Sequence, residues 1–254
     1  MMENAFQEIF DKGYCIVQNA FDGHEIAKMR REVLDNLHLM SNTRRAKAAF
    51  HIAGFHRSLD LEHLHLKVSG NRHLLNAMKA IYDQGSVIAL GLTDITVNRS
   101  QPWHTDLLRG KYAKFLDMDT CWNVSNHPCL KALVYLQDGE SLKVIPGSHL
   151  NQIDLSSDAN VVPQDEARVE RVRATAGDII LMDIRLIHRG ATDEQMEAKT
   201  LDNDAKILIS TVFGEKCVFR RIRPPIPTTS GHLFRGIRPP VTRCREAACF
   251  GYQS

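Results

Sequence analysis

Apolar side chains recur at helical spacing in the first third of this 254-residue chain. Residues 4–11 are amphipathic, and a second helical pattern runs from about 24 to 39, where Asp22 can cap its start. A third helical pattern covers roughly 73–82, and 13–18 form a short β-type run between the first two. This part of the chain is therefore expected to be mostly helical.

Beyond residue 86 the pattern changes to short apolar runs separated by turn-forming Gly, Pro, Asn, Asp and Ser. These runs lie at 87–91, 94–98, 130–136, 142–145, 179–187 and 206–213. Many short strands at such spacing are typical of a β-sandwich or barrel. We therefore predict a mainly β core over residues 86–213, supported by helices from residues 1–85.

Three stretches follow neither period and are predicted to be loops, at 39–60, 107–128 and 151–167. Long loops within a compact domain often act as lids or binding elements. In addition, Pro146-Gly-Ser-His149 and Gly177-Asp178 are patterns typical of tight turns, so we expect His149 and these turn residues to be structural.

Composition favours a globular protein. With 43 % hydrophobic residues the chain can bury a substantial core, and we expect one domain over residues 1–254. It has neither the pattern of a signal peptide nor an apolar run long enough to span a membrane, which favours a soluble, unexported protein. Six cysteines without a Cys-x-x-Cys pair fit reduced thiols, and hence a cytoplasmic location.

Charge is concentrated at the end of the chain. The net charge is +2, but residues 214–254 hold eight Lys or Arg against Glu215 and Glu246. Because these charges are spread out and interrupted by prolines, they form no continuous basic stripe. A solvated or core-wrapping tail is therefore favoured over a surface for nucleic acid or an anionic membrane, and we expect a small molecule as partner. The oligomeric state does not follow from the sequence.

The strongest indication of chemistry is Trp103-His104-Thr105-Asp106. In a strand, alternate side chains share a face, so His104 and Asp106 project together. A second histidine, His188, ends an apolar run further along the chain. Two imidazoles and one carboxylate suggest a non-heme iron site with open positions for a co-substrate and dioxygen. Taken alone, however, the triplet occurs by chance in many chains, and His188 could be a hydrogen-bonded structural histidine.

Four blocks of sequence, in order, resemble the phytanoyl-CoA dioxygenase-like family of Fe(II)- and 2-oxoglutarate-dependent oxygenases. The blocks are Phe10-Asp-Lys-Gly-Tyr-Cys-Ile-Val-Gln with the residues to Ile26, Pro102-Trp-His-Thr-Asp-Leu107, Leu142-Lys-Val-Ile-Pro-Gly-Ser-His149, and Ala176-Gly-Asp-Ile-Ile-Leu-Met-Asp183 with Leu186-Ile-His-Arg-Gly190. The resemblance implies a double-stranded β-helix, or jelly roll of the cupin type. It also implies that His104, Asp106 and His188 hold Fe(II), and that 2-oxoglutarate and O2 are co-substrates.

The resemblance further implies hydroxylation of a small-molecule metabolite, with release of succinate and CO2. Desaturation, ring formation and epimerisation are variants of the same chemistry. Halogenating relatives give up the carboxylate ligand, so the presence of Asp106 favours these oxidations over halogenation. The alternative is a non-catalytic jelly-roll protein that binds a metal or a ligand.

The distal carboxylate of 2-oxoglutarate needs a cation. The family commonly places an arginine on the strand after the second histidine, whereas this chain has Lys206 at the position we align with it. Lysine makes a point-charge contact without the planar two-pronged grip of arginine. Lys206 is therefore the expected anchor, although it could instead point into water at a strand start. Lys131, which interrupts an apolar run, is the second candidate.

The predicted loop 107–128 begins directly after the candidate ligands and mixes cations with aromatics. We expect Arg109, Lys111 and Tyr112 to contact the substrate, and the cations to favour a substrate with a carboxylate or phosphate. The competing interpretation is a surface helix with an ordinary charged face. Trp103 is expected to pack against the barrel wall.

Overall fold

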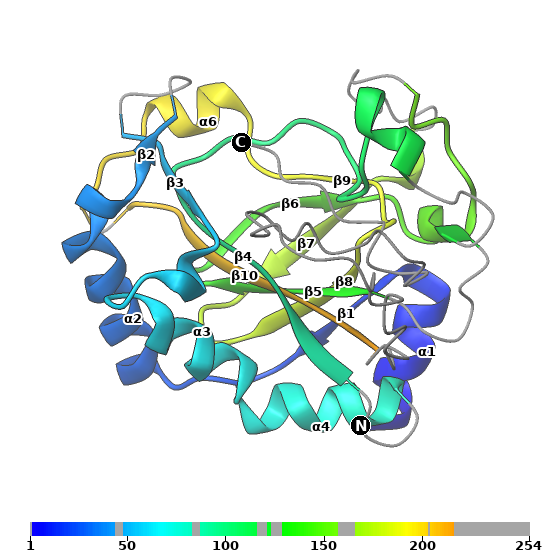
Figure 1. The fold of residues 1–254 in the computed structure, drawn as a ribbon, viewed down its shortest axis with the longest axis horizontal. Helices are drawn as coiled ribbons and strands as arrows, with labels where there is room; N and C mark the ends of the chain where they lie inside the picture. The colour runs from blue at the N-terminus through cyan, green and yellow to red at the C-terminus, as the bar shows by residue number, and fades with distance from the viewer. Residues whose placement is uncertain are drawn as a thin grey trace, which may run out of the picture.

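A computed structural model of the protein describes residues 2–43, 48–82, 87–115, 121–122, 129–156, 166–202 and 204–215. Its larger helices gather on one side of a curved β-sheet (Figure 1). They are α1 (Met2–Lys12), α2 (Gly23–Asp35), α3 (Glu62–Ser69) and α4 (Arg72–Ile81). Asp22 starts α2 with a capping box, in which its carboxylate accepts from the backbone N–H of Glu25 at 2.8 Å. The predicted helices and the cap are confirmed.

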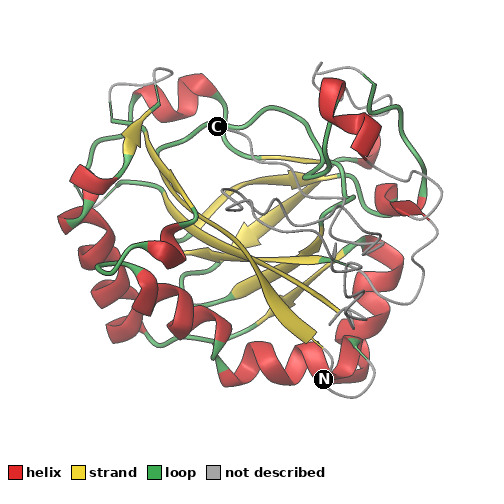
Figure 2. Cartoon of the chain, viewed as in Figure 1, coloured by secondary structure: helices red, strands yellow, loops and turns green. Residues whose placement is uncertain are grey.

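The strands of the described chain form two antiparallel sheets (Figure 2). The larger has the order β1-β8-β5-β10-β4-β3-β2 and the smaller the order β7-β6-β9. The strands are β1 (Tyr14–Val17), β2 (Ser41–Asn42), β3 (Phe50–Ala53), β4 (Val87–Val97), β5 (Leu130–Tyr135), β6 (Gly139–Val144), β7 (Glu170–Ala174), β8 (Ile179–Asp183), β9 (His188–Arg189) and β10 (Ile207–Glu215). The predicted jelly roll with supporting N-terminal helices is confirmed.

The outer face of the large sheet is covered by the helices. Alternate residues such as Ile95 on β4 and Ile209 on β10 are fully buried against Met29, Leu74 and Met78. Each such side chain contributes roughly 1.5–3 kcal/mol through its removal from water. The inward-facing side chains of the strands and the apolar faces of the helices therefore pack together in one core.

The inner face of the large sheet changes character along its length. Leu133 and Tyr135 on β5 pack with Leu142 and Val144 on β6 and with Val172 on β7, which closes one part of the interior between the two sheets. The other part of the interior carries polar side chains. Between the two parts lies a pocket whose apolar lining includes Leu133, Tyr135 and Leu142.

Some elements differ from the sequence prediction. The predicted loop 39–60 contains β2 and β3, which pair with each other and extend the sheet beyond β4. The runs 87–91 and 94–98 form the single strand β4, whose pairing with β10 shifts register between Thr211 and Phe213. Helix α3 and strand β7 were also not predicted. The edge strands β2 and β7 need few apolar residues, so their periodicity is weak. Helix α3 is short and buries only Leu64 and Val68.

The predicted run 179–187 is also interrupted. Strand β8 ends at Asp183, and a turn leads to β9. The guanidinium of Arg185 donates to both carboxylate oxygens of Asp183, at 2.9 and 2.6 Å, and both side chains are buried. Asp106 in turn donates its backbone N–H to the carbonyl of Ile184 at 2.9 Å. The turn therefore ties the approach to His188 to the segment that carries Asp106.

Two predicted turns behave as expected. Gly177 has φ +102°, and a Cβ there would lie 2.4 Å from the carbonyl oxygen of Phe21, so the position requires glycine. His149 is buried and its Nε2 lies 3.0 Å from the carbonyl oxygen of Phe10, which agrees with the structural role predicted for it.

The remaining short elements are α6 (Asp193–Glu197) and the 3-10 turns Leu37–Leu39, Phe55–Arg57, Gly110–Phe115, Ser148–Leu150 and Glu166–Arg168. The predicted basic segment 214–254 lies outside the described residues after Glu215, as do parts of the predicted loops 107–128 and 151–167. Over the described part of the chain, no helix is both long and apolar enough to cross a bilayer.

Candidate metal centre

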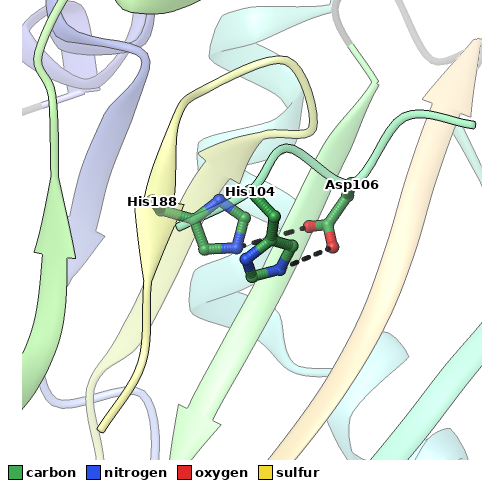
Figure 3. Close-up of side chains that lie close together, drawn as sticks. All are labelled: His104, Asp106 and His188. Carbon is green, nitrogen blue, oxygen red and sulfur yellow. Dashed lines mark ion pairs between the residues drawn. The ribbon is translucent and has the colours of Figure 1, made fainter. Parts of the chain in front are cut away.

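His104 and His188 face each other as a directly paired bridge. The backbone N–H of each donates to the carbonyl of the other at 2.9 Å, and the two ring centroids lie 4.2 Å apart. Such hydrogen-bonded neighbours present their side chains to the same face. Main-chain hydrogen bonds thus bring together residues that lie far apart in sequence. Figure 3 shows the resulting group of side chains, with both imidazoles beside the carboxylate of Asp106.

The tautomer of each imidazole follows from its backbone contact. Nδ1 of His104 lies 2.7 Å from the carbonyl oxygen of Pro102, and Nδ1 of His188 lies 2.9 Å from that of Leu186. A carbonyl only accepts, so each Nδ1 carries the proton and each Nε2 holds a lone pair. Burial lowers the pKa of His104 to about 3 and also lowers that of His188, which keeps both rings neutral. Neutral imidazole is the form that ligates a metal.

Asp106 completes the cluster. Its Oδ1 lies 3.8 Å from Nε2 of His104 and its Oδ2 lies 3.8 Å from Nε2 of His188, both too long for hydrogen bonds. Lys131 donates to Oδ1 at 3.0 Å. Burial alone would raise the pKa of Asp106, but the charge and the hydrogen bond of Lys131 outweigh burial and hold the pKa well below its ordinary value. The carboxylate is therefore ionised.

The three side chains fit a metal ion. One ligand atom from each lies within 4.8 Å of the others, and this is the only such group among the described residues. Nε2 of His104 and Oδ2 of Asp106 are buried without a hydrogen-bond partner in that part of the chain. Orphaned buried acceptors are costly unless something binds them. Two neutral imidazoles and one carboxylate suit Fe(II) and leave other positions free.

A pocket extends from His188 between the two sheets. Its polar lining residues are Asp94, Thr96, Arg99, Gln101, Lys131, His188 and Ser210. Its apolar lining residues are Leu133, Tyr135, Leu142 and Leu208, together with Gly190. A polar ligand with an aliphatic middle matches such a lining.

Lys206 lies at the start of β10, on the same face as Leu208 and Ser210. Its ammonium lies 5.7 Å from the ring centroid of Tyr135, which lines the pocket. The residue is only 9 % exposed, and burial alone lowers its pKa to about 8. Because the side chain is buried, the alternative that Lys206 points into water at a strand start does not hold. Among the described residues it forms no ion pair.

Arg99 is the cation that sequence reasoning missed. It lines the pocket and directly follows Asn98. The backbone N–H of Asn98 donates to the carbonyl of Lys206 at 2.8 Å, and the backbone N–H of Lys206 donates to Oδ1 of Asn98 at 2.7 Å. Asp94 and Ser210 were missed as well, although they occupy the inward positions of β4 and β10 and pair directly. Period-two counting from Leu208 indicates Ser210. Arg99 carries no such signal, because it lies beyond the end of its strand.

The three candidate substrate contacts in the predicted loop 107–128 lie in different surroundings. Arg109 has two buried guanidinium nitrogens, Nε and Nη1, with no hydrogen-bond partner among the described residues. Lys111 and Tyr112 are exposed and contact each other, the ammonium lying 5.0 Å from the ring centroid. The structure does not bring these two into the pocket. Trp103 is half-buried, with the guanidinium of Arg189 5.7 Å from its ring centroid.

Solved structures with the same fold include non-heme enzymes that depend on 2-oxoglutarate, also called alpha-ketoglutarate. The epimerase SnoN from nogalamycin biosynthesis aligns with a TM-score of 0.60 at 16 % identity, covering 92 % of both chains. HygX from Streptomyces hygroscopicus, solved with nickel, 2-oxoglutarate and hygromycin B, gives 0.58 at 16 % identity over 84 % of this chain and 86 % of its own. The carbocyclase SnoK, also from nogalamycin biosynthesis, gives 0.57 at 17 % over 84 % and 83 %.

A search of curated protein sequences gave no significant match. The profile of phytanoyl-CoA dioxygenase (PhyH) matches residues 10–194, which is most of the chain and includes all three candidate metal ligands. The family uses iron, 2-oxoglutarate and dioxygen, in agreement with the donor set found here. The chain therefore belongs to the phytanoyl-CoA dioxygenase family of 2-oxoglutarate-dependent non-heme iron enzymes.

Proposed function

We propose that this enzyme oxidises a small-molecule metabolite at an Fe(II) ion held by His104, Asp106 and His188. The observation that carries the proposal is the convergence of three buried ligand atoms beside a polar pocket. Bound iron would supply the activation of dioxygen. In a hydroxylation, 2-oxoglutarate loses CO2 to become succinate, one oxygen atom of dioxygen enters succinate and the other enters the substrate.

The chain itself orients the site and keeps water out. The Nδ1–H bonds of His104 and His188 fix both rings with their lone pairs toward Asp106. The apolar floor formed by Leu133 and Leu142 limits the water around the co-substrate. Asp106 as third ligand supports hydroxylation, desaturation, ring formation or epimerisation, in preference to halogenation.

We assign the distal carboxylate of 2-oxoglutarate to Lys206, whose ammonium lies beside the pocket residue Tyr135, with Arg99 of the pocket lining as a second cation. A buried ammonium without a counter-charge is stabilised when an anion enters. Lys131 is the weaker candidate, because its ammonium already binds Asp106.

Lys206→Ala tests this assignment by anaerobic titration of 2-oxoglutarate into the metal-loaded protein. A charge-assisted hydrogen bond contributes about 1.5–3 kcal/mol, so we expect the affinity to fall by about tenfold to hundredfold. Lys199→Ala is the matched control, since Lys199 pairs with Asp204 at the surface. An unchanged affinity in Lys206→Ala would remove the assignment.

We further propose that the substrate carries a carboxylate or phosphate. Two buried nitrogens of Arg109, which have no hydrogen-bond partner in the described part of the chain, support this, because a guanidinium group needs acceptors. A mass-difference screen of metabolite extracts with and without enzyme identifies the substrate. An anionic substrate whose KM rises in Arg109→Gln is the expected result, and a neutral substrate would contradict the proposal.

A cytoplasmic location is also proposed, supported by the buried residues Cys15, Cys121 and Cys129, which form no disulfide among the described residues. Cell fractionation with an antibody against the protein tests it.

The activity itself is tested by succinate release in air with Fe(II), 2-oxoglutarate and metabolite extract. His104→Ala is expected to abolish both iron binding and succinate release. His73→Ala, an exposed histidine on α4, is the control and should behave as wild type. Failure of the wild-type protein to bind iron would refute the proposal.

A further inference from the structure

Lys131 enters the barrel from the middle of the large sheet. It lies on β5, which is paired with β8 on one side and β10 on the other. Its ammonium donates to Oδ1 of Asp106 at 3.0 Å, and the two side chains are 14 % and 17 % exposed. A strand held on both sides gives this lysine little freedom to move away.

The two oxygens of Asp106 are consequently unequal. Oδ1 is engaged by Lys131, whereas Oδ2 is buried without a hydrogen-bond partner among the described residues. Oδ2 also faces Nε2 of His188 at 3.8 Å. A divalent cation is repelled by a neighbouring ammonium, so it is better placed on the oxygen that lacks one. The other two ligands, His104 and His188, likewise each offer a single atom.

We propose that Lys131 is a positioning residue that keeps Asp106 a one-oxygen ligand and so preserves an open coordination position on the metal. This inference rests on the proposed function, because it assumes that the cluster binds Fe(II). A carboxylate can bind a metal through one oxygen or both. If Oδ1 also bound, it would occupy a position that the chelating 2-oxoglutarate or dioxygen needs.

This role differs from that of an anchor for the distal carboxylate of 2-oxoglutarate, for which Lys131 is the second candidate. An anchor would affect 2-oxoglutarate only, whereas a positioning residue acts on the metal before any co-substrate is present. Metal binding in the absence of 2-oxoglutarate therefore separates the two roles.

The test uses Co(II) as probe in the full-length protein, because its visible absorption reports the number and arrangement of ligands. Lys131→Met removes the donor with little change in length, and Lys131→Arg restores a cationic donor. Lys199→Met is the matched surface control. Circular dichroism establishes that each variant is folded.

We expect Lys131→Met to bind Co(II) but with a changed absorption spectrum, because the released Oδ1 joins the ligands. Its affinity for 2-oxoglutarate should fall by about tenfold, the lower end of the loss in metal affinity or activity that typically follows removal of a metal ligand's partner. Lys131→Arg should restore the wild-type spectrum, and Lys199→Met should match wild type.

A wild-type Co(II) spectrum in Lys131→Met overturns the inference. If the spectrum is unchanged and only the affinity for 2-oxoglutarate falls, Lys131 contacts the co-substrate directly. Should Lys131→Met fail to fold, Lys131→Gln carries the same test, because its shorter neutral amide cannot replace the charged contact. An unchanged Co(II) spectrum in Lys131→Gln would also overturn the inference. Failure of the proposed function gives a different result, in which neither wild type nor any variant binds Co(II).

Discussion

The ammonium group of Lys206 is buried, and burial disfavours its charged form. Burial lowers its pKa from the usual 10.5 to about 8, and no described carboxylate lies close enough to compensate. Its neighbour is the ring of Tyr135, whose π face stabilises a cation only modestly. The arrangement therefore favours an incoming anion over the empty pocket.

A pH dependence follows for co-substrate binding. The protonated ammonium is needed to bind a carboxylate, so affinity for 2-oxoglutarate should be full below pH 8 and should decline as pH rises above it. Anaerobic titrations at several pH values measure this. Lys206→Arg is the comparison, because guanidinium stays charged over the range and its affinity should stay flat.

Folding stability should respond in the opposite sense. Between pH 8 and 10.5 the unfolded chain keeps a proton on Lys206 that the native protein has released. The contribution of this residue to the free energy of unfolding therefore rises with pH across that window when no 2-oxoglutarate is present. A Lys206→Met variant that retains the same increase would show that other groups cause it.

At the scale of elements, the turn after β8 depends on one buried ion pair. Asp183→Asn leaves Arg185 charged and uncompensated, which is expected to lower the free energy of unfolding by about 3–5 kcal/mol. Urea denaturation followed by circular dichroism measures the loss. Glu8→Gln in the surface pair with Lys12 should cost less than about 1 kcal/mol. Equal small losses would mean that the turn is held by its backbone alone.

Asn98 joins the end of β4 to the start of β10. It is fully buried with φ +48°, and its side-chain amide donates to the carbonyls of Ala48 and Thr200. Asn98→Ala leaves these acceptors and the N–H of Lys206 unpaired, so we expect a loss of at least about 3 kcal/mol and weaker binding of 2-oxoglutarate.

Asn98→Gly separates the two causes of that loss, since glycine accepts positive φ but has no amide. It should be more stable than Asn98→Ala by about 1 kcal/mol. Urea denaturation of both variants makes the comparison. The reverse order would show that backbone conformation at this position does not matter.

Strands with strong apolar runs were predictable, because β5, β8 and β10 are buried on both faces. Strand β7 was not, since only Val172 and Ala174 point inward between polar neighbours. The metal triad was predictable from sequence order and family resemblance. The ion pair of Lys131 with Asp106 was not, because side-chain pairing across the barrel depends on which strands become neighbours.

At the scale of the whole molecule, metal and co-substrate should stabilise the native fold together. A ligand at a hundredfold excess over its Kd adds about 2.7 kcal/mol. For a chain of this size that corresponds to a rise of several degrees in Tm. Thermal denaturation with Ni(II) and 2-oxoglutarate measures it, and His104→Ala should lose the co-substrate effect. An equal rise without metal would place 2-oxoglutarate outside the metal centre.

Strand β10 is the last strand of the described chain, yet it lies between β5 and β4 in the large sheet. During synthesis on the ribosome, β4, β5 and β8 all emerge before the strand that joins them. His104 and Asp106 follow β4, whereas Lys131 lies on β5 and His188 lies on β9 of the smaller sheet. Such long-range pairing is slow and forms late. We therefore expect the large sheet behind the metal centre to close only after residues 207–215 have been translated.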